Sequence, residues 1–398
     1  MTAVTGADGT TVEPSQYYIV TLPTPLAPKE QTTISISYYV LGAVTPVPAS
    51  IRQEEKQYLS YSFSAYFPSA YPTLKQKTNM KLGTADIPSY TSTTGLRTSK
   101  DPEVQGTKLT YGQYDTRVEA GASYSVTIRY EFTKPVLVAS LLERDIEVSH
   151  WGGNLAAEER YWLRNDGATL IDHFDRVKWA MQNFASSLPS SALRELKVPL
   201  RAGSVDPYFT DDIGNVSTSR YRPGLVREAS LELKPRYPVF GGWKYSFRIG
   251  WNNALGSFAR KLKVGNSYVL SVPVLEGPRM QEGIQYENMQ LNIILPEGSK
   301  ITKWETAGGT NVPELAVEQT VHKTFMDTLG RQKLTLRARN VVDELRDVNV
   351  LISYEYSLLS ALRKPISIIL GTMSVFVVAW SLSLVNTSIG KRTKKMII

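Results

Sequence analysis

Two pairs of adjacent carboxylates are the first candidates for chemistry in this chain of 398 residues, and they are Glu158–Glu159 and Asp211–Asp212. Two carboxylates that face one another across a cleft can act as acid and base in glycoside hydrolysis. Adjacent acids in polar turns more often face solvent, because burying an ionised carboxylate is costly. We therefore expect these acids at the surface, and a membrane-bound glycosidase remains one hypothesis.

Histidine and cysteine offer little further chemistry. The chain has three histidines, which are His150, His173 and His322, and it has no cysteine. Widely separated histidines without cysteine partners do not predict a zinc site, and a chain without cysteine has no thiol nucleophile or disulfide. The motifs GxSxG, HExxH, GxxxxGK[ST] and GxGxxG are also absent from the sequence. We expect no catalytic residue, no metal site and no cofactor.

Asn215 begins an Asn-Val-Ser tripeptide, which is the acceptor pattern for an N-linked glycan. The tripeptide lies in a polar, turn-rich segment, as a glycosylated surface loop would. Because this modification takes place in a lumen, the pattern favours a luminal position for this part of the chain. Asn386 begins a second match, Asn-Thr-Ser, but it adjoins an apolar segment near the C-terminus and is expected to stay unmodified.

Residues 365–385, PISIILGTMSVFVVAWSLSLV, form that uncharged apolar segment. About 20 residues of α-helix rise ~30 Å, which matches the hydrocarbon thickness of a bilayer. Basic residues lie on both sides of the segment, and Pro365 suits the first position of a helix. We predict a single transmembrane helix over residues 363–386, followed by a short basic tail over residues 387–398.

The charges beside this helix bear on its orientation. Basic residues in the tail outnumber those just before the span by four to three, so the positive-inside rule puts the tail in the cytoplasm. Residues 1–15 lack the basic and apolar regions of a signal peptide, and we expect them to be disordered. From the residues alone, both a luminal ectodomain and a tail-anchored cytosolic domain stay open.

Small residues share one face of the predicted membrane helix, and they are Ser367, Gly371, Ser374 and Ser381. Their spacing brings them to the same side of a helix with 3.6 residues per turn. Small side chains let a second membrane helix approach closely. We predict a helix-packing face here, which makes the chain a subunit of an assembly.

Apolar and polar residues alternate with a period of two along much of the remaining chain, which predicts β-strands. The clearest segments are 34–38, 126–132, 334–338 and 350–356. Helical signals are few and fall at residues 172–185 and 190–197. We predict a mainly β protein with two tandem β-rich domains, residues 16–145 and 146–362, ahead of the membrane helix.

Five tryptophans concentrate in the middle of the chain, and they are Trp151, Trp162, Trp179, Trp243 and Trp251. Exposed rings on a β-rich domain could stack on sugars or on polypeptide. A stand-alone luminal lectin-like or chaperone protein is therefore the alternative hypothesis, with Trp243 and Trp251 as its binding residues. Large aromatic side chains usually fill a core, however, and we expect that role for most of the five.

The net charge of +8 is spread among acidic residues, without a long basic run. This distribution is typical of a solvated basic surface. We expect the membrane as a partner and no nucleic acid.

Five ungapped runs, in chain order, resemble members of the ribophorin I family. They are EVSHWGG (147–153), DPYFTDDIGNVSTS (206–219), PRYPVFGGW (235–243), ILPEGS (294–299) and FMDTLGR (325–331). The resemblance extends from about Gln16 to the apolar segment. Ribophorin I is a non-catalytic subunit of the oligosaccharyltransferase complex of the endoplasmic reticulum. That complex transfers a preassembled oligosaccharide from dolichol diphosphate to asparagine of a nascent protein.

The resemblance implies two luminal domains, one span in the endoplasmic reticulum membrane and a cytosolic tail. It implies an accessory role in complex assembly and in substrate handling near the translocon. The partners would be the catalytic and other subunits of the complex, together with the translocon and the nascent polypeptide. It also favours the luminal orientation and makes Asn215 the expected glycosylation site. Members of the family carry a signal and a longer first domain ahead of the match to residues 16–23, so we expect the first domain to be incomplete, with an unpaired sheet edge.

Overall fold

The computed structural model of the protein describes residues 21–385, apart from residues 23, 94–100, 186–188, 264, 310–311 and 326. The chain separates into two units between Val40 and Leu41. The predicted disordered segment 1–15 and the predicted tail 387–398 lie outside the described residues.

In the first unit, the described part of residues 21–40 contains no helix or strand. The strand predicted over residues 34–38 is therefore wrong. Ile34, Ile36 and Tyr38 are 52%, 64% and 66% exposed. An alternating segment becomes a strand when its backbone N–H and C=O groups are hydrogen-bonded to a neighbouring strand and one of its faces is buried. No described strand pairs with residues 34–38.

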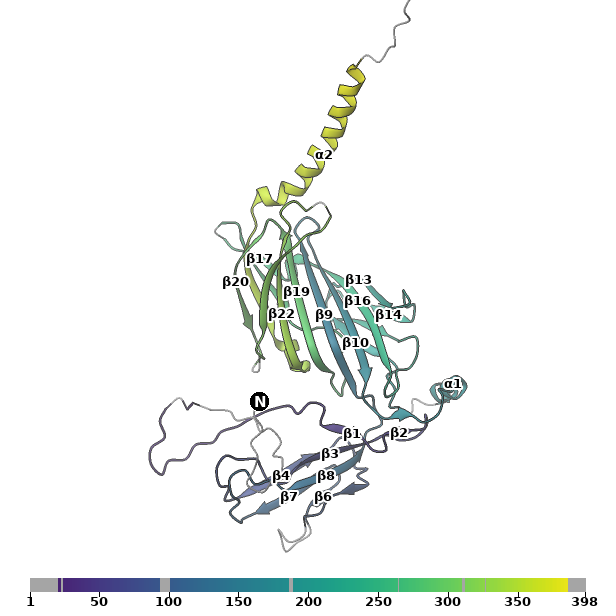
Figure 1. Cartoon of the computed structure of the whole chain (residues 1–398), viewed down its shortest axis with the longest axis vertical. Coiled ribbons are helices and arrows are strands. Elements are labelled where there is room, and N and C mark those ends of the chain that lie inside the picture. Colours follow the sequence, from purple (N-terminus) through teal and green to yellow (C-terminus); the bar gives the residue numbers. More distant parts are fainter. Residues whose placement is uncertain are drawn as a thin grey trace, which may run out of the picture. The chain divides into compact units, whose positions relative to one another are not determined.

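The second unit is built on a seven-stranded sheet with the order β13-β16-β10-β9-β19-β22-β21 (Figure 1). The strands are β9 (Leu137–Ser149), β10 (Asn154–Asn165), β13 (Val205–Asp211), β16 (Lys244–Ala254), β19 (Gln285–Glu297), β21 (Ala316–His322) and β22 (Arg331–Val341). Neighbours are antiparallel except β9 and β19, which are parallel. The C-terminal ends of β9 and β19 therefore meet at one edge of the sheet, where antiparallel β22 begins.

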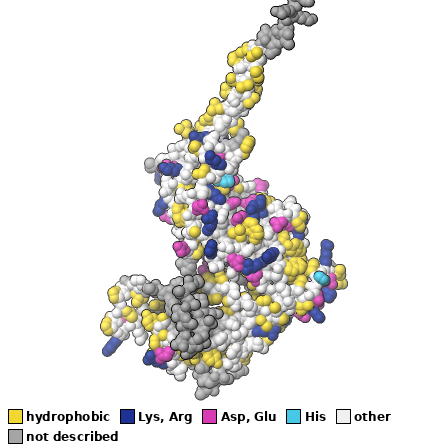
Figure 2. All heavy atoms as spheres, in the orientation of Figure 1, with side chains coloured by type: hydrophobic (Ala, Val, Ile, Leu, Met, Phe, Trp, Pro, Cys, Tyr) yellow, Lys and Arg dark blue, Asp and Glu magenta, His cyan; other side chains and the backbone are white. Residues whose placement is uncertain are grey.

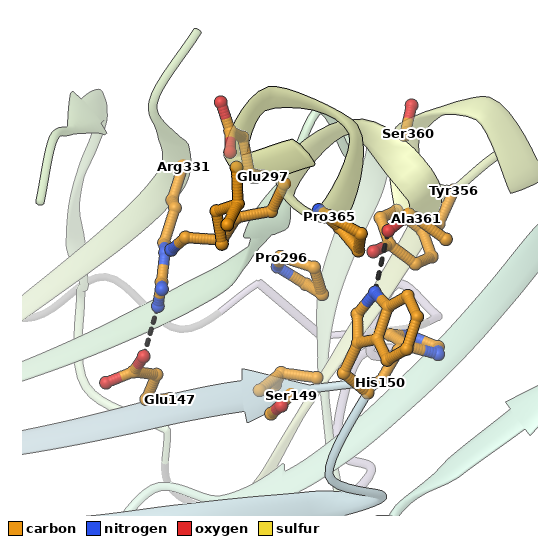
Figure 3. A pocket seen from close by; sticks show the side chains of 14 residues that line it. Glu147, Ser149, His150, Pro296, Glu297, Arg331, Tyr356, Ser360, Ala361 and Pro365 are labelled. Carbon is orange, nitrogen blue, oxygen red and sulfur yellow. Dashed lines mark hydrogen bonds and ion pairs between the residues drawn. The ribbon is translucent and has the colours of Figure 1, made fainter. Parts of the chain in front are cut away.

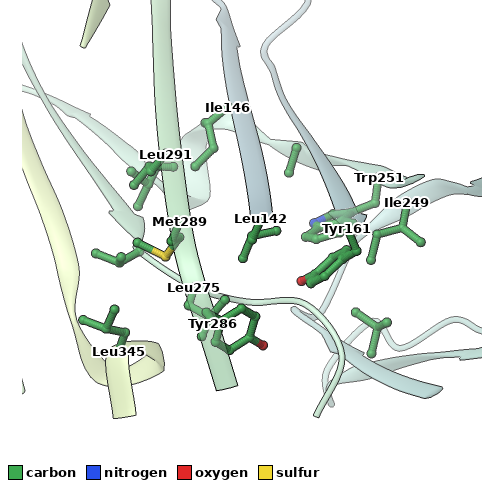
Figure 4. Close-up of a cluster of buried hydrophobic side chains, with 14 of the residues drawn as sticks. Leu142, Ile146, Tyr161, Ile249, Trp251, Leu275, Tyr286, Met289, Leu291 and Leu345 are labelled. Carbon is green, nitrogen blue, oxygen red and sulfur yellow. The ribbon is translucent and has the colours of Figure 1, made fainter. Parts of the chain in front are cut away.

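Two smaller sheets pack against this sheet, with the orders β12-β15-β14 and β17-β18-β23-β20. Their strands are β12 (Leu196–Leu200), β14 (Ser219–Arg222), β15 (Ala229–Leu233), β17 (Ala259–Lys261), β18 (Ser267–Pro273), β20 (Lys300–Ala307) and β23 (Asn349–Glu355). The short 3-10 helices are η1 (Leu255–Ser257) and η2 (Asp343–Asp347). Buried side chains from the three sheets form one hydrophobic core, and Tyr161, Trp251 and Tyr286 are among its largest members (Figure 4).

A smaller core lies in the preceding part of this unit, between sheets of order β1-β3-β8-β5 and β4-β7-β6. The strands are β1 (Val44–Pro46), β3 (Tyr58–Ser64), β4 (Gln76–Lys81), β5 (Ser89–Tyr90), β6 (Glu103–Gln105), β7 (Lys108–Tyr114) and β8 (Ser125–Glu131). A parallel pair, β2 (Ser50–Ile51) with β11 (Thr169–Leu170), joins residues from both parts. The division predicted between residues 145 and 146 stays a prediction, and Asp145 lies inside β9.

The mainly β fold is confirmed, and the strands predicted near residues 126, 334 and 350 correspond to β8, β22 and β23. One of the two short predicted helices is present, as α1 (Arg176–Ala185). The helix predicted over residues 190–197 is wrong, because this segment leads into β12. Leu196, Val198 and Leu200 are buried on one face of β12 while the strand pairs with β15, and this pairing outweighs a helical propensity that is weak in any short segment.

The C-terminal helix α2 spans Leu358–Leu384, and its 27 residues are apolar enough to cross a membrane. Ser357 caps it by accepting a hydrogen bond from the backbone N–H of Ser360. The helix begins before the residue that the sequence indicated, since Pro365 lies inside it rather than at its first position. Figure 1 shows that α2 bends close to its start, as a proline inside a helix commonly causes.

Candidate functional site

A cavity of about 360 Å³ lies where the seven-stranded sheet meets the start of α2 (Figure 3). Its lining includes Glu147, His150, Trp151, Glu297, Arg331 and Pro365. We call this region the helix junction. Sheet topology explains its position, because β9 and β19 end there, β22 begins there and β23 leads from there into α2.

Three of the five sequence runs that resemble ribophorin I meet at the helix junction. The run 147–153 forms the end of β9 and the turn after it, and the run 294–299 forms the end of β19 and the turn after it. The described residues of the run 325–331 belong to the loop before β22 and to its first residue, Arg331. Sequence reasoning named these runs but did not predict that they lie together. Their convergence depends on the order of the strands, which no local pattern reveals.

The first contact at the helix junction joins Trp151 to α2. The indole Nε1–H of Trp151 donates to the backbone carbonyl of Ala361 over 2.6 Å. In a regular α-helix that carbonyl accepts from the residue four positions later, and here that residue is Pro365, which has no N–H. Trp151 therefore supplies a donor at the point where the proline removes one.

A second contact joins Lys364 of α2 to Asp327 of the loop before β22. The Lys364 Nζ lies 2.9 Å from Asp327 Oδ1, and the Asp327 side chain has no exposed surface. Asp327 also accepts from the backbone N–H and the hydroxyl of Thr324. Burial raises the pKa of this carboxyl, but the bonds from Thr324 and Lys364 outweigh it and lower the pKa to about 2.

Glu297 holds the same loop from the end of β19. One of its carboxylate oxygens accepts from the backbone N–H groups of Thr328 and Leu329 and from the Thr328 hydroxyl. Burial raises the pKa of Glu297, and these hydrogen bonds lower it by more, so its carboxylate stays charged. Arg331, the first residue of β22, forms an ion pair with Glu147 of β9 (Figure 3).

His150 is the remaining polar group at the junction. Its Nε2 lies 2.9 Å from the hydroxyl of Tyr354, and its ring packs against Tyr268 and Tyr356. Burial lowers the pKa of His150, which favours the neutral ring. The acids of the junction are thus bonded to the loop before β22, to Arg331 or to Lys364, and His150 is bonded to Tyr354. This arrangement is suited to holding a helix in place.

The other two runs also meet, around Asn215. Arg236 from the run 235–243 forms an ion pair with Asp211 and donates to the backbone carbonyls of Gly214 and Asn215. Asp211 in turn accepts from the backbone N–H groups of Ile213 and Gly214, which closes a tight turn. Asn215 itself is exposed at the end of this turn. The predicted glycan acceptor therefore stands on a turn that is fixed from two sides.

The paired carboxylates do not act together in this structure. Glu159 is fully buried and forms an ion pair with Arg144, whereas Glu158 points to the opposite face of β10 and accepts from the Tyr208 hydroxyl. The expectation that these acids lie at the surface is wrong for Glu159 and for Asp211, whose side chains are 0% and 3% exposed, because Arg144 and Arg236 neutralise them. In the part of the chain that the structure describes, no group of three or more His, Asp or Glu residues is arranged to hold a metal ion.

The tryptophans are divided between core and surface. Trp251 is 2% exposed and lies in the large core, and Trp243 packs against that core while partly buried. Trp251 therefore cannot stack on a sugar, which removes one of the two residues on which the lectin hypothesis was based. Trp151 is 64% exposed, and its indole N–H is hydrogen-bonded to the carbonyl of Ala361.

The predicted helix-packing residues lie along α2. The hydroxyls of Ser367, Ser374 and Ser381 donate to backbone carbonyls of the same helix, over 2.8, 2.6 and 2.7 Å. A Cβ built on Gly371 meets no atom of another part of the chain within 4 Å. The four small residues thus form a face without large side chains, and its hydroxyl groups are hydrogen-bonded within the helix.

Comparison with known proteins covers nearly the whole chain. A family model described as ribophorin I matches residues 3–383. The chain belongs to the ribophorin I family. Subunit 1 of the dolichyl-diphosphooligosaccharide–protein glycosyltransferase of Schizosaccharomyces pombe is 35% identical to it, over 85% of this chain and 73% of the yeast protein.

Two further relatives in the ribophorin I family carry similar names. Subunit 1 of Caenorhabditis elegans is 33% identical over 88% of this chain but only 56% of the worm protein, and subunit 1B of rice is 30% identical over 95% of this chain and 75% of the rice protein. Among solved structures, an M1 zinc metallopeptidase from Deinococcus radiodurans aligns with 54% of this chain and 42% of its own, with a TM-score of 0.31 and 11% identity. A TM-score at this level supports no inference about this chain.

Proposed function

We propose that this chain is a subunit of the oligosaccharyltransferase complex, which glycosylates nascent proteins in the endoplasmic reticulum. Membership of the ribophorin I family carries the proposal, since the relatives from yeast, worm and rice are named as subunit 1 or 1B of this glycosyltransferase. The subunit would take part in complex assembly and in substrate handling near the translocon, with the catalytic and other subunits and the nascent polypeptide as its partners.

A non-catalytic role agrees with the chemistry of the described residues. Glu159 is neutralised by Arg144, Asp211 is bound by Arg236, and Asp327 is bound by Lys364. These carboxylates hold elements of the fold together, and each already has a cationic partner. The helix junction therefore supports a subunit that positions a membrane helix while another subunit performs the transfer.

Purification of the full chain from its own membranes in a mild detergent tests the assignment. We expect a multispanning catalytic subunit to be recovered with it in a constant ratio, and the recovered complex to transfer oligosaccharide to an acceptor peptide. A chain that elutes alone as a single species, from membranes whose transferase activity is intact, would contradict the assignment.

We further propose that the residues before α2 lie in the lumen and that the tail is cytosolic. The exposed Asn215 supports this orientation, as does the excess of basic residues after the span. Asn215→Gln should abolish the shift in electrophoretic mobility that endoglycosidase treatment produces in the wild type. Asn386→Gln serves as the control and should leave the shift unchanged. A wild-type chain that shows no shift would argue for the cytosolic orientation.

A further inference from the structure

Exposed apolar side chains lie at the start of α2 and in the loop before β22, which the bond between Asp327 and Lys364 ties to α2. Phe325 is 90% exposed, Leu358 is 73% exposed and Leu359 is 80% exposed. Single large apolar side chains are often this exposed in soluble proteins. A group of them indicates a surface that contacts a membrane or another molecule. Phe325 belongs to the loop before β22, so the group includes residues from two separate segments.

The length of α2 indicates what covers them. Its 27 residues rise about 40 Å, whereas the hydrocarbon core of a bilayer is ~30 Å thick. The part from Pro365 to Leu384 accounts for about 30 Å of this length. The first two turns, Leu358–Lys364, therefore exceed what the hydrocarbon core accommodates and fall at the level of the lipid headgroups.

These two turns have one face on the protein and one face outward. On the inner face, the hydroxyl of Ser360 donates to the carbonyl of Gly298 over 3.2 Å, and Lys364 is paired with Asp327. On the outer face, Leu358 and Leu359 are exposed, and the apolar surface continues from them along the span, where hydrophobic side chains are spread over the visible face of α2 (Figure 2). A helix with this division of faces is typical of segments that lie in a membrane interface.

We propose that the first two turns of α2 and the loop tip at Phe325 form a membrane-interface surface that inserts its apolar side chains between lipids. The occupant is the bilayer, because the patch is continuous with a helix that is itself apolar enough to span it. The helix junction, with its bonds from Trp151 and Asp327, then fixes the distance between the β-sheet edge and the lipid surface. This surface does not depend on membership of the oligosaccharyltransferase complex.

The absence of cysteine from the chain makes a direct test straightforward, since each variant then carries a single thiol. Phe325→Cys and Leu359→Cys would be labelled with an environment-sensitive fluorophore in the full chain, reconstituted in phosphatidylcholine nanodiscs. Both side chains are exposed, so the fold should tolerate the change. Val375→Cys, within the span, is the positive control.

Val226→Cys is the matched negative control, because Val226 is apolar and 93% exposed. Val226 lines a different cavity, together with Arg346 of η2. Because η2 connects the end of β22 to the start of β23, this cavity lies at the end of the sheets away from α2. A label at this position should respond to quenchers in water and not to quenchers in lipid.

We expect the labels at residues 325 and 359 to lose most of their fluorescence to lipids that carry a doxyl group near the headgroup end of the acyl chain. They should also be shielded from iodide, relative to the label at residue 226. Labels at residues 325 and 359 that respond only to iodide would overturn the proposal. Labels shielded from both quenchers would also overturn it, since polypeptide rather than lipid would then cover the patch. The label at residue 375, near the middle of the span, should instead be quenched by lipids that carry the doxyl group near the methyl end of the acyl chain. If it escapes that deeper doxyl group, the membrane placement of α2 fails and the proposal fails with it, whereas co-purification with a catalytic subunit would be unaffected.

Discussion

The indole of Trp151 donates to the carbonyl of Ala361 over 2.6 Å, at the place where Pro365 has no N–H to offer. Trp151 lies in the turn after β9, two residues beyond its end, and Ala361 is the fourth residue of α2. A donor from the sheet therefore replaces one that the helix lacks. Because an unsatisfied backbone carbonyl costs free energy wherever water is scarce, this bond stabilises the bend near the start of α2.

A double-mutant cycle tests the coupling between Trp151 and Pro365. Trp151→Phe keeps a large ring but removes the donor, and it should lower the free energy of unfolding by about 1 kcal/mol. In a Pro365→Ala background residue 365 can donate to Ala361, so Trp151→Phe should cost close to nothing. Urea unfolding in detergent micelles, followed by circular dichroism, measures all four proteins. Equal costs of Trp151→Phe in both backgrounds would mean that the two residues act independently.

The carboxyl of Asp327 predicts a loss of stability in acid. Its pKa is lowered from 3.8 to about 2, so the ionised form stabilises the fold above pH ~4 and this contribution disappears as the pH falls through 2. Asp327→Asn should lower the free energy of unfolding at neutral pH by about 2 kcal/mol and flatten its decline between pH 4 and 2.

The control for this prediction is Asp212→Asn, which alters an exposed carboxylate in a different turn. It should change the free energy of unfolding by less than about 0.5 kcal/mol at neutral pH and leave the acid decline intact. If both substitutions flatten the decline equally, the acid sensitivity arises from net charge and not from the contact between Asp327 and Lys364.

The buried ion pair of Arg144 and Glu159 predicts a large effect in the main core. Their side chains are 1% and 0% exposed, and Glu276 also pairs with Arg144. Glu159→Gln leaves Arg144 without one of its two anions in a place that water does not reach, and it should cost about 3–5 kcal/mol. Glu287→Gln is the control, because the pair of Glu287 with Arg164 is 33% and 30% exposed and should be worth about 1 kcal/mol or less. Similar losses for both variants, measured by urea unfolding, would contradict this difference.

The small-residue face of α2 predicts a loss of assembly. Gly371→Leu places a large side chain where a partner helix would pack, and it should reduce recovery of the other subunits about fivefold, the equivalent of ~1 kcal/mol. Met373→Leu is the matched control, because Met373 is 57% exposed and lies off this face. Quantitative mass spectrometry of the purified material measures both. Unchanged recovery for Gly371→Leu would show that another surface holds the complex together.

Local sequence was sufficient for features that depend on neighbouring residues along the chain. The apolar run that becomes α2 and the alternation in β8, β22 and β23 were readable, because burying one face of a strand or all sides of a membrane helix imposes a period on the sequence. The same reasoning failed at residues 34–38, where alternation is present but no described strand pairs with the segment. It also failed at residues 190–197, where pairing with β15 produces β12.

The start of α2 and the composition of the helix junction depend on contacts between distant residues. Pro365 reads in sequence as a helix start, yet the helix begins earlier because Ser357 caps it and Trp151 compensates for the missing donor. The runs 147–153, 294–299 and 325–331 are far apart in the chain, and they meet because β9 and β19 are parallel and β22 is antiparallel to them. Sequence periodicity shows which face of an element is buried, because burial selects the side chains on that face. Strand order depends on hydrogen bonds between backbone groups, which every residue except proline can form, so it produces no pattern in the sequence.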